Sequence, residues 1–246
     1  MKGRWKLLLA GPILAAALGG CALRPPPAPP LSAPAATAAP RPAPHVGTPY
    51  DIVPQESLLL VRVYRGGTLA SAGHNHVIAS HDLSGSVYLP DDVVRSSFEV
   101  HLPVSTLTVD EAALRAAEAS ADFPPEVSEG AKGGTRHNML GAALLDADQY
   151  PEIVLEALDL TAADGGAVLA RILCTVRGGQ HVISVPVRYQ RGAGTLTLSG
   201  ETRLRQSDLG LTPFSAMLGA LQVQDEMRIS FRILARAARV GGAARE

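Results

Sequence analysis

The amino-acid sequence predicts an all-β domain, in which an antiparallel sheet of about eight strands closes into a barrel and one or two short helices are added. Apolar and polar residues alternate over most of the chain after residue 50, which is the period of a strand with one buried face. Short turns rich in glycine, proline and aspartate separate these segments. Many strands joined by short connections favour a closed barrel, and a two-layer sandwich is the alternative.

The alternation is clearest in four segments, residues 98–104, 183–189, 195–205 and 226–233. Their predicted inward positions are Val100, Leu102, Ile183, Val185, Val187, Tyr189, Leu196, Leu198, Met227, Ile229 and Phe231. Further strands are expected at 57–64, 68–80, 83–89, 152–160 and 167–177. The lumen of a barrel of roughly eight strands is either filled by its own side chains or holds one small ligand. The sequence leaves both a packed core and a cavity open.

Two segments break this period and are predicted to be helical. Asp110 is a candidate N-cap for a helix over 111–119, which Phe123-Pro124-Pro125 would end. The apolar residues of 137–147 repeat at helical spacing, so one face of that helix should lie on the sheet. Residues 210–221 are a third candidate, for which an apolar loop at the barrel mouth fits equally well.

The first twenty residues predict an export signal. Lys2, Arg4 and Lys6 precede an apolar run that is too short to span a membrane comfortably. Leu18-Gly19-Gly20-Cys21 resembles the lipobox of bacterial lipoproteins, which implies cleavage before Cys21 and lipid attachment to its sulfur. Several acyl chains on one residue suffice for stable membrane anchoring. Ala22 rather than Asp follows, and by resemblance to the Gram-negative sorting rule this indicates the periplasmic face of the outer membrane.

The remaining organisation follows from composition. Residues 21–49 are predicted to be a lipidated tether, because Arg24 to Pro49 contains ten prolines and no apolar periodicity. Residues 50–235 form the expected barrel domain, and 236–246 are predicted to be a disordered tail. Loss of residues 1–20 removes three positive charges and no negative ones, so the net charge changes from -1 to -4. This acidic balance, without a basic patch, argues against nucleic acid as a partner.

Four short motifs carry a family resemblance. They are Ala72-Gly73-His74-Asn75-His76-Val77, Asp148-Gln149-Tyr150-Pro151-Glu152-Ile153, Val176-Arg177-Gly178-Gly179-Gln180-His181, and Asp208-Leu209-Gly210-Leu211 with Val223-Gln224-Asp225-Glu226-Met227. In this order and spacing they resemble the YceI-like family of bacterial envelope proteins. The resemblance implies a lipocalin-like barrel whose apolar lumen holds a polyisoprenoid or isoprenoid-quinone chain. The sequence departs from the family pattern at Gly179-Gln180-His181 and in a longer 111–136 segment.

The functional prediction is therefore a lipid-anchored, noncatalytic carrier or sequestering protein. We expect no cofactor beyond a bound isoprenoid lipid or quinone, with the apolar ligand and the membrane as partners, and the sequence is compatible with a homodimer. The predicted mouth residues, some of which would meet a polar head, are His74, His76, His137, Met139, Phe214 and Met217. His-dependent metal binding is the first alternative, since paired imidazoles bind Zn or Cu. A purely structural envelope lipoprotein is the second.

Two further observations bear on chemistry. Cys21 and Cys174 are the only cysteines, so lipid on Cys21 would leave no internal disulfide. Cys174 lies in an alternating apolar run with no cation beside it, which favours a buried, inert thiol over a nucleophile. The sequence contains no Gly-x-Ser-x-Gly, Walker, Rossmann or His-Glu-x-x-His motif, so catalysis is the least favoured class.

Overall fold

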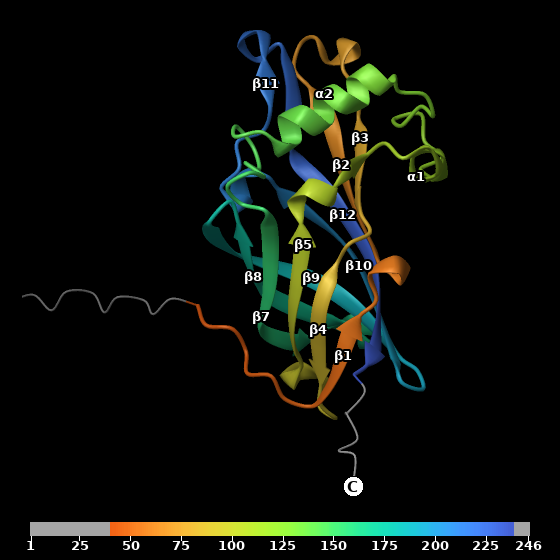
Figure 1. Ribbon diagram of the computed structural model, residues 1–246, viewed down its shortest axis with the longest axis vertical. Helices are drawn as coiled ribbons and strands as arrows, with labels where there is room; N and C mark the ends of the chain where they lie inside the picture. Colours follow the sequence, from red (N-terminus) through yellow and green to blue (C-terminus); the bar gives the residue numbers. More distant parts are fainter. Residues whose placement is uncertain (1–39, 239–246) are drawn as a thin grey trace, which may run out of the picture. The chain divides into compact units, whose positions relative to one another are not determined.

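The computed structural model describes residues 40–238, which form an antiparallel β-barrel (Figure 1). The strands are β1 (Thr48–Ile52), β2 (Leu58–Gly66), β3 (His76–Ser80), β4 (Ser84–Leu89), β5 (Ser97–Pro103), β6 (Thr108–Val109), β7 (Glu152–Ala162), β8 (Val168–Val176), β9 (Gly179–Arg191), β10 (Thr195–Arg205), β11 (Ser215–Ala216) and β12 (Leu221–Ala237). The sheet closes because β1 pairs with β4 on one side and with the end of β12 on the other. The predicted fold class is confirmed.

Three walls of the barrel are each built from two strands in series. A 3-10 turn at Pro54–Glu56 separates β1 from β2, residues 81–83 separate β3 from β4, and a second 3-10 turn at Val104–Thr106 separates β5 from β6. β1 pairs with β4 and β2 with β3, while β4 pairs with β5 and β3 with β6. Counting each such pair as one wall gives the eight-stranded barrel that the sequence predicts. Pro54 lacks a backbone N–H, which suits the first break.

β9 and β10 separate along part of their length. Their pairing covers only Leu196–Ser199 with Arg188–Arg191, whereas β9 pairs with β8 over Gly179–Val187 and β10 pairs with β12 over its whole length. The pairing ends beside Gly200, where a Cβ atom would lie 2.4 Å from the Pro186 carbonyl oxygen and 2.7 Å from the Phe231 ring. Only glycine allows this close approach of two backbones.

The two ends of the barrel differ in their connections. At one end short turns join β4 to β5, β7 to β8, and β9 to β10 (Figure 1). The C-terminal end of the described region, after β12, also lies there. The opposite end, called the mouth below, has the long β5–β7 connection with both helices and the loops 66–75 and 206–221 (Figure 1). The residues from three of the four recognised motifs meet here: Gly178 packs on Tyr150, and Gly210 on His181.

Of the two predicted helices, the first is present with shorter bounds, and the second is wrong for 141–147 and right only where it overlaps α2. α1 covers Ala112–Ala117, and Asp110 does not cap it, because its side chain instead binds groups from β3 and α1. α2 covers Glu129–Leu140 rather than 137–147. The Ser128 hydroxyl caps α2 by accepting from the Ala131 amide, and the helix ends before Gly141. Helix propensity did not predict the first part of this helix, because Gly130, Gly133 and Gly134 are poor helix formers.

At the mouth one expectation is corrected, and one choice that the sequence left open is decided. The segment 68–80 is not one strand, because Leu69 and the short 3-10 turn Ala70–Ala72 precede β3. At Gly67 (φ +87°) a Cβ atom would lie 2.3 Å from the Ala220 carbonyl oxygen, so the chain must turn there. Residues 210–221 form an apolar loop with the short strand β11, not a helix.

The barrel also extends past its predicted bounds. β1 begins at Thr48, within the expected tether, and β12 continues to Ala237, within the expected tail. Ahead of β1, the Ala43 amide donates to the Ala157 carbonyl and the His45 ring stacks on Tyr88. The predicted signal peptide 1–20, the lipid attachment at Cys21, the tether up to residue 39 and the tail from residue 239 lie outside the described residues. In the described range, none of the helices combines the length and apolar character needed to span a bilayer.

Candidate functional site: an apolar lumen and a polar vestibule

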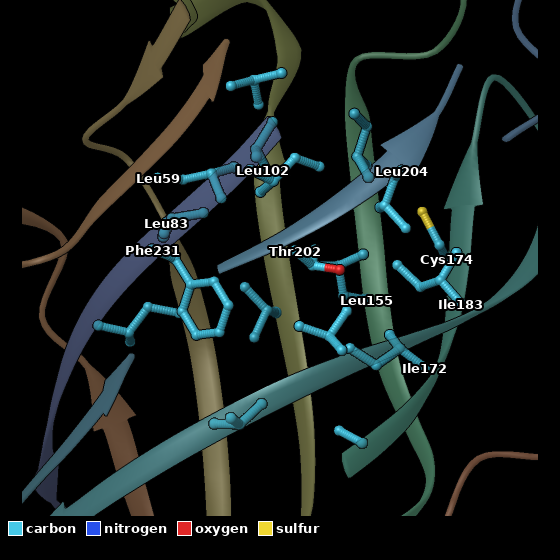
Figure 2. Close-up of a pocket in the computed structure, with 18 of the residues that line it drawn as sticks. Leu59, Leu83, Leu102, Leu155, Ile172, Cys174, Ile183, Thr202, Leu204 and Phe231 are labelled. Carbon is cyan, nitrogen blue, oxygen red and sulfur yellow. The ribbon is translucent and has the colours of Figure 1, made fainter. Parts of the chain in front are cut away.

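The barrel encloses a cavity of about 280 Å³, called the lumen. It is lined by every residue that the sequence placed there, namely Val100, Leu102, Ile183, Val185, Val187, Tyr189, Leu196, Leu198, Met227, Ile229 and Phe231. Figure 2 shows Ile183, Leu155 and Phe231, from three different strands, projecting into the same space. The structure therefore favours the cavity over the fully packed core that the sequence also allowed.

The lumen is apolar because the alternation of its strands is regular. On β9, Ile183, Val185 and Val187 face inward, while Ser184 and Arg188 between and after them are exposed. Few polar side chains line the cavity: Ser96 is near one end, Thr202 is in the wall, and Gln206 is at the mouth. Such a lumen offers few partners for water, so it suits a ligand with a long apolar chain.

Cys174 of β8 lies in the lumen wall, as expected of a buried thiol. Burial raises its pKa from 9.0 to about 11. A thiol with this pKa is almost wholly protonated at neutral pH and is a poor nucleophile. The side chain therefore acts as part of the apolar wall.

A second cavity of about 300 Å³, the vestibule, adjoins the lumen at the mouth. It lies against α2, β2, β3 and the start of β12, and it shares Val63, Ile78, Met139, Leu144 and Gln206 with the lumen lining. Its polar lining residues are Arg65, His74, His76, Thr135, Asn138, Gln206 and Gln222. The residues lining this cavity, all within the described part of the chain, include no carboxylate.

The predicted mouth residues divide into two groups. His74, His76, Met139 and Phe214 line the vestibule, and the rings of His74 and His76 are 6.1 Å apart. His137 and Met217 do not line either cavity, and both are exposed. His137 lies on the exposed face of α2, whereas residues such as Gly134, Thr135 and Asn138 of the same helix line the vestibule. Met217 is at the tip of a loop rather than on a helix.

A buried polar network fixes the floor of the vestibule. His76 Nδ1 lies 2.6 Å from Asp110 Oδ2, and the Arg115 guanidinium donates to Asp110 Oδ1 at 2.7 Å. Because a carboxylate only accepts, Nδ1 carries a proton, while Nε2 is an acceptor in the neutral ring and a donor in the imidazolium. Nε2 lies 3.0 Å from the Thr135 hydroxyl of α2. The network thus joins β3, α1 and α2.

Asp110 is held as an anion in this network. Burial opposes its ionisation, but hydrogen bonds from His76 and the Val77 amide, with the charges of His76 and Arg115, outweigh burial and lower its pKa below 3.8. The Arg115 guanidinium also donates to the Asn75 and Pro124 carbonyls. Its side chain and that of Asp110 are almost completely buried. The two charges are therefore paired with each other, although Arg115 Nη2 is buried without a hydrogen-bond partner among the described residues.

The order of hydroxyl, imidazole and carboxylate is that of a nucleophile, base and orienting group. Thr135, however, lies inside α2, where backbone amides are used within the helix and do not present a pair of donors to a developing oxyanion. The arrangement is therefore suited to binding and orientation: Thr135 and His76 hold α2 in place over the mouth.

The last recognised motif positions Gln206 between the two cavities. Asp225 accepts hydrogen bonds from the Ser207 amide at 2.8 Å and the Ser207 hydroxyl at 2.5 Å. These bonds from Ser207 lower the pKa of Asp225. The neighbouring Gln206 side chain donates to the Gln224 carbonyl at 2.9 Å. Asp225 thus ties the β10–β12 connection to β12 and keeps Gln206 at the boundary.

Sequence reasoning missed several residues of this site. It singled out His76, but it took Asp110 for a helix cap and gave no role to Arg115 or Thr135, which with Asp110 determine the orientation of the imidazole. The His74-Asn75-His76 pair of imidazoles also suggested a metal site. Among residues 40–238, no three His, Cys, Asp or Glu side chains are arranged to hold one metal ion.

The YceI-like domain model matches residues 50–235, which is most of the chain. The chain belongs to the YceI-like family. A search among curated proteins finds no match.

Solved structures of this family and of related barrels resemble the chain. BcnA of Burkholderia cenocepacia is 15% identical, with a TM-score of 0.55 over 75% of this chain and 99% of that one, which supports the fold. A polyisoprenoid binding domain from Saccharophagus degradans is 12% identical, with a TM-score of 0.49 over 77% and 98% of the two chains. The Campylobacter jejuni YceI protein is 11% identical, with a TM-score of 0.46 over 64% and 82%.

Proposed function

We propose that this YceI-like protein binds one apolar, isoprenoid-type lipid or quinone and carries or sequesters it without chemical change. The observation that carries the proposal is the apolar lumen that adjoins a polar vestibule at one end. Together the two cavities fall in the range of roughly 300–1,000 Å³ that is typical of ligand sites. A chain with an apolar tail and one polar head matches both parts.

The vestibule restricts the chemistry of the head. Arg65, His74 and Asn138 offer hydrogen-bond donors, and the residues lining this cavity include no carboxylate that would repel an acceptor. A carbonyl, hydroxyl or phosphate oxygen is therefore a suitable head. An ammonium group would be repelled by the positive charge of Arg65, with no carboxylate in the lining to offset that repulsion. A quinone ring or the oxygen end of a polyisoprenoid meets this requirement.

The proposal includes the position in the cell. Lipid on Cys21 would hold the domain at the periplasmic face of the outer membrane, with the proline-rich segment as a tether. Incorporation of labelled palmitate into the wild type but not into Cys21→Ser tests this part. Labelling of both proteins to the same level would contradict it.

The ligand itself is tested by extraction and by filling the lumen. Protein purified from its own host should yield an apolar molecule with one polar head on organic extraction and by native mass spectrometry. Ile183→Trp should reduce the bound amount several-fold, because the indole occupies space in the cavity. It should fold with a nearly unchanged urea midpoint, whereas in a packed core the added bulk would cost about 1–3 kcal/mol.

Ser184→Trp is the matched control, since it adds the same side chain one residue away on the exposed face of β9. It should change neither the lipid content nor the stability. If the wild type yields no apolar molecule and Ile183→Trp only destabilises the barrel, the carrier function is wrong and a structural role replaces it.

A further inference from the structure

Two adjoining loops at the mouth are free of charge. Residues 66–73 and 210–221 contain no Asp, Glu, Lys or Arg, although charged residues make up 18% of the chain. The Leu69 amide donates to the Ala220 carbonyl at 2.7 Å, which joins the two loops. Figure 1 shows them beside each other beyond α2, at the end of the barrel. They form the most protruding part of the mouth in this view.

These loops also expose large apolar side chains. Leu218 is fully exposed, Met217 is 69% exposed and Leu69 is 41% exposed. The other exposed large apolar residues in the described part of the chain, Leu169 and Val182, lie on the barrel wall. Single exposed apolar residues are ordinary, but three on two joined, uncharged loops at one end of the barrel point to an interaction site. We call these three residues the tip.

The backbone of the tip is held in an unusual conformation. Met217 (φ 51°) and Leu218 (φ 56°) are both left-handed, which is rare for large apolar residues. β11 pairs with the start of β12 on the two sides of this turn, and the Val223 amide donates to the Phe214 carbonyl at 2.9 Å. The surrounding structure therefore maintains a strained turn that directs apolar side chains into solvent, which is a feature of functional sites.

We propose that the tip inserts into the surface of a lipid bilayer and thereby faces the mouth toward the membrane. A bilayer is the partner that fits, because the tip is convex and uncharged, whereas protein interfaces usually add polar or charged groups around an apolar centre. The proposal rests in part on the proposed function, since an isoprenoid-type ligand is itself dissolved in membranes. It adds the route by which such a ligand would reach the lumen.

The chain offers a direct test because its single tryptophan is Trp5. In the full-length Trp5→Phe/Leu218→Trp protein, the indole reports only on the tip. Added vesicles of phosphatidylethanolamine and phosphatidylglycerol should shift its emission to the blue, and brominated acyl chains should quench it. Trp5→Phe/Leu69→Trp, with the reporter on the second loop, should behave in the same way.

Trp5→Phe/Leu169→Trp is the control, because Leu169 is 37% exposed but lies at the start of β8, at the end of the barrel opposite the mouth. Its emission should be unaffected by brominated lipid. The proposal is overturned if tip and wall reporters are quenched equally, or not at all. A blue shift without vesicles that grows with protein concentration also overturns it and assigns the tip to self-association. Quenching at the tip in a protein that yields no extracted lipid would leave membrane contact standing while the carrier function failed.

Discussion

The lumen and the vestibule adjoin each other, yet opposite rules determine their structure. The lumen is built from inward residues of regular strands, and its properties follow from apolar burial alone. The floor of the vestibule is instead held at the junction of β3, α1 and α2, where a buried carboxylate, guanidinium and imidazole contact one another. The lumen should therefore tolerate exchanges between apolar side chains, whereas the network under the vestibule should be destabilised by the loss of a single charged group.

This difference predicts the largest effect for Asp110→Asn. The substitution removes the negative charge from a pair whose partner Arg115 is almost completely buried, so we expect a loss of about 3–5 kcal/mol in the free energy of unfolding at pH 7. Urea unfolding measures it. The matched control is Asp159→Asn, whose partner Arg171 lies 2.5 Å away but is half exposed, and which should cost less than about 1 kcal/mol. Equal losses in both variants would contradict the comparison.

The same pair predicts a pH dependence with a defined sign. The folded-state pKa of Asp110 is lower than its ordinary 3.8, so its contribution to stability is complete above that value and is lost as the pH falls through the folded pKa. The difference in stability between the wild type and Asp110→Asn should therefore be constant near neutrality and decrease below pH 3.8. A difference that grows on acidification would have the wrong sign.

In the lumen, the sharpest prediction concerns Cys174. With its pKa raised to about 11 from 9.0, the thiolate fraction at pH 8 is about 100-fold lower than that of an ordinary thiol. Alkylation by iodoacetamide should be slower in the folded protein than in urea by at least this factor. Measurement in Cys21→Ser leaves Cys174 as the sole thiol. Rapid labelling of the folded protein would show that water reaches the lumen wall.

A smaller effect is expected where α2 meets the vestibule floor. Thr135→Val keeps the shape of the side chain but removes the hydroxyl that lies 3.0 Å from His76 Nε2. We expect a loss of about 1 kcal/mol in urea unfolding, typical of one partly buried hydrogen bond. Val61→Ala in the lumen wall should also lower stability, but through lost apolar contact and not through a lost hydrogen bond. No change in Thr135→Val would mean that α2 is held by apolar packing alone.

The same contrast explains what could be predicted from the sequence. Alternation identified the lumen residues, because a regular strand fixes which side chains share a face. It could not identify Asp110, since its partners His76 and Arg115 come together only through long-range folding and the left-handed backbone at Asp110 (φ 53°) has no periodic signal. α2 was placed too late because its glycines are typical of a loop, while its cap at Ser128 is a single residue.

The incomplete seam between β9 and β10 determines how the wall can deform. Hydrogen bonds join these strands only over Leu196–Ser199 and Arg188–Arg191, so separating them breaks fewer bonds than separating β10 from β12. Local opening should be least costly where the fewest bonds must break. Where the β9–β10 pairing ends, beside Gly200, the two strands are joined by packing alone, so this seam is the part of the wall that should open at the lowest cost.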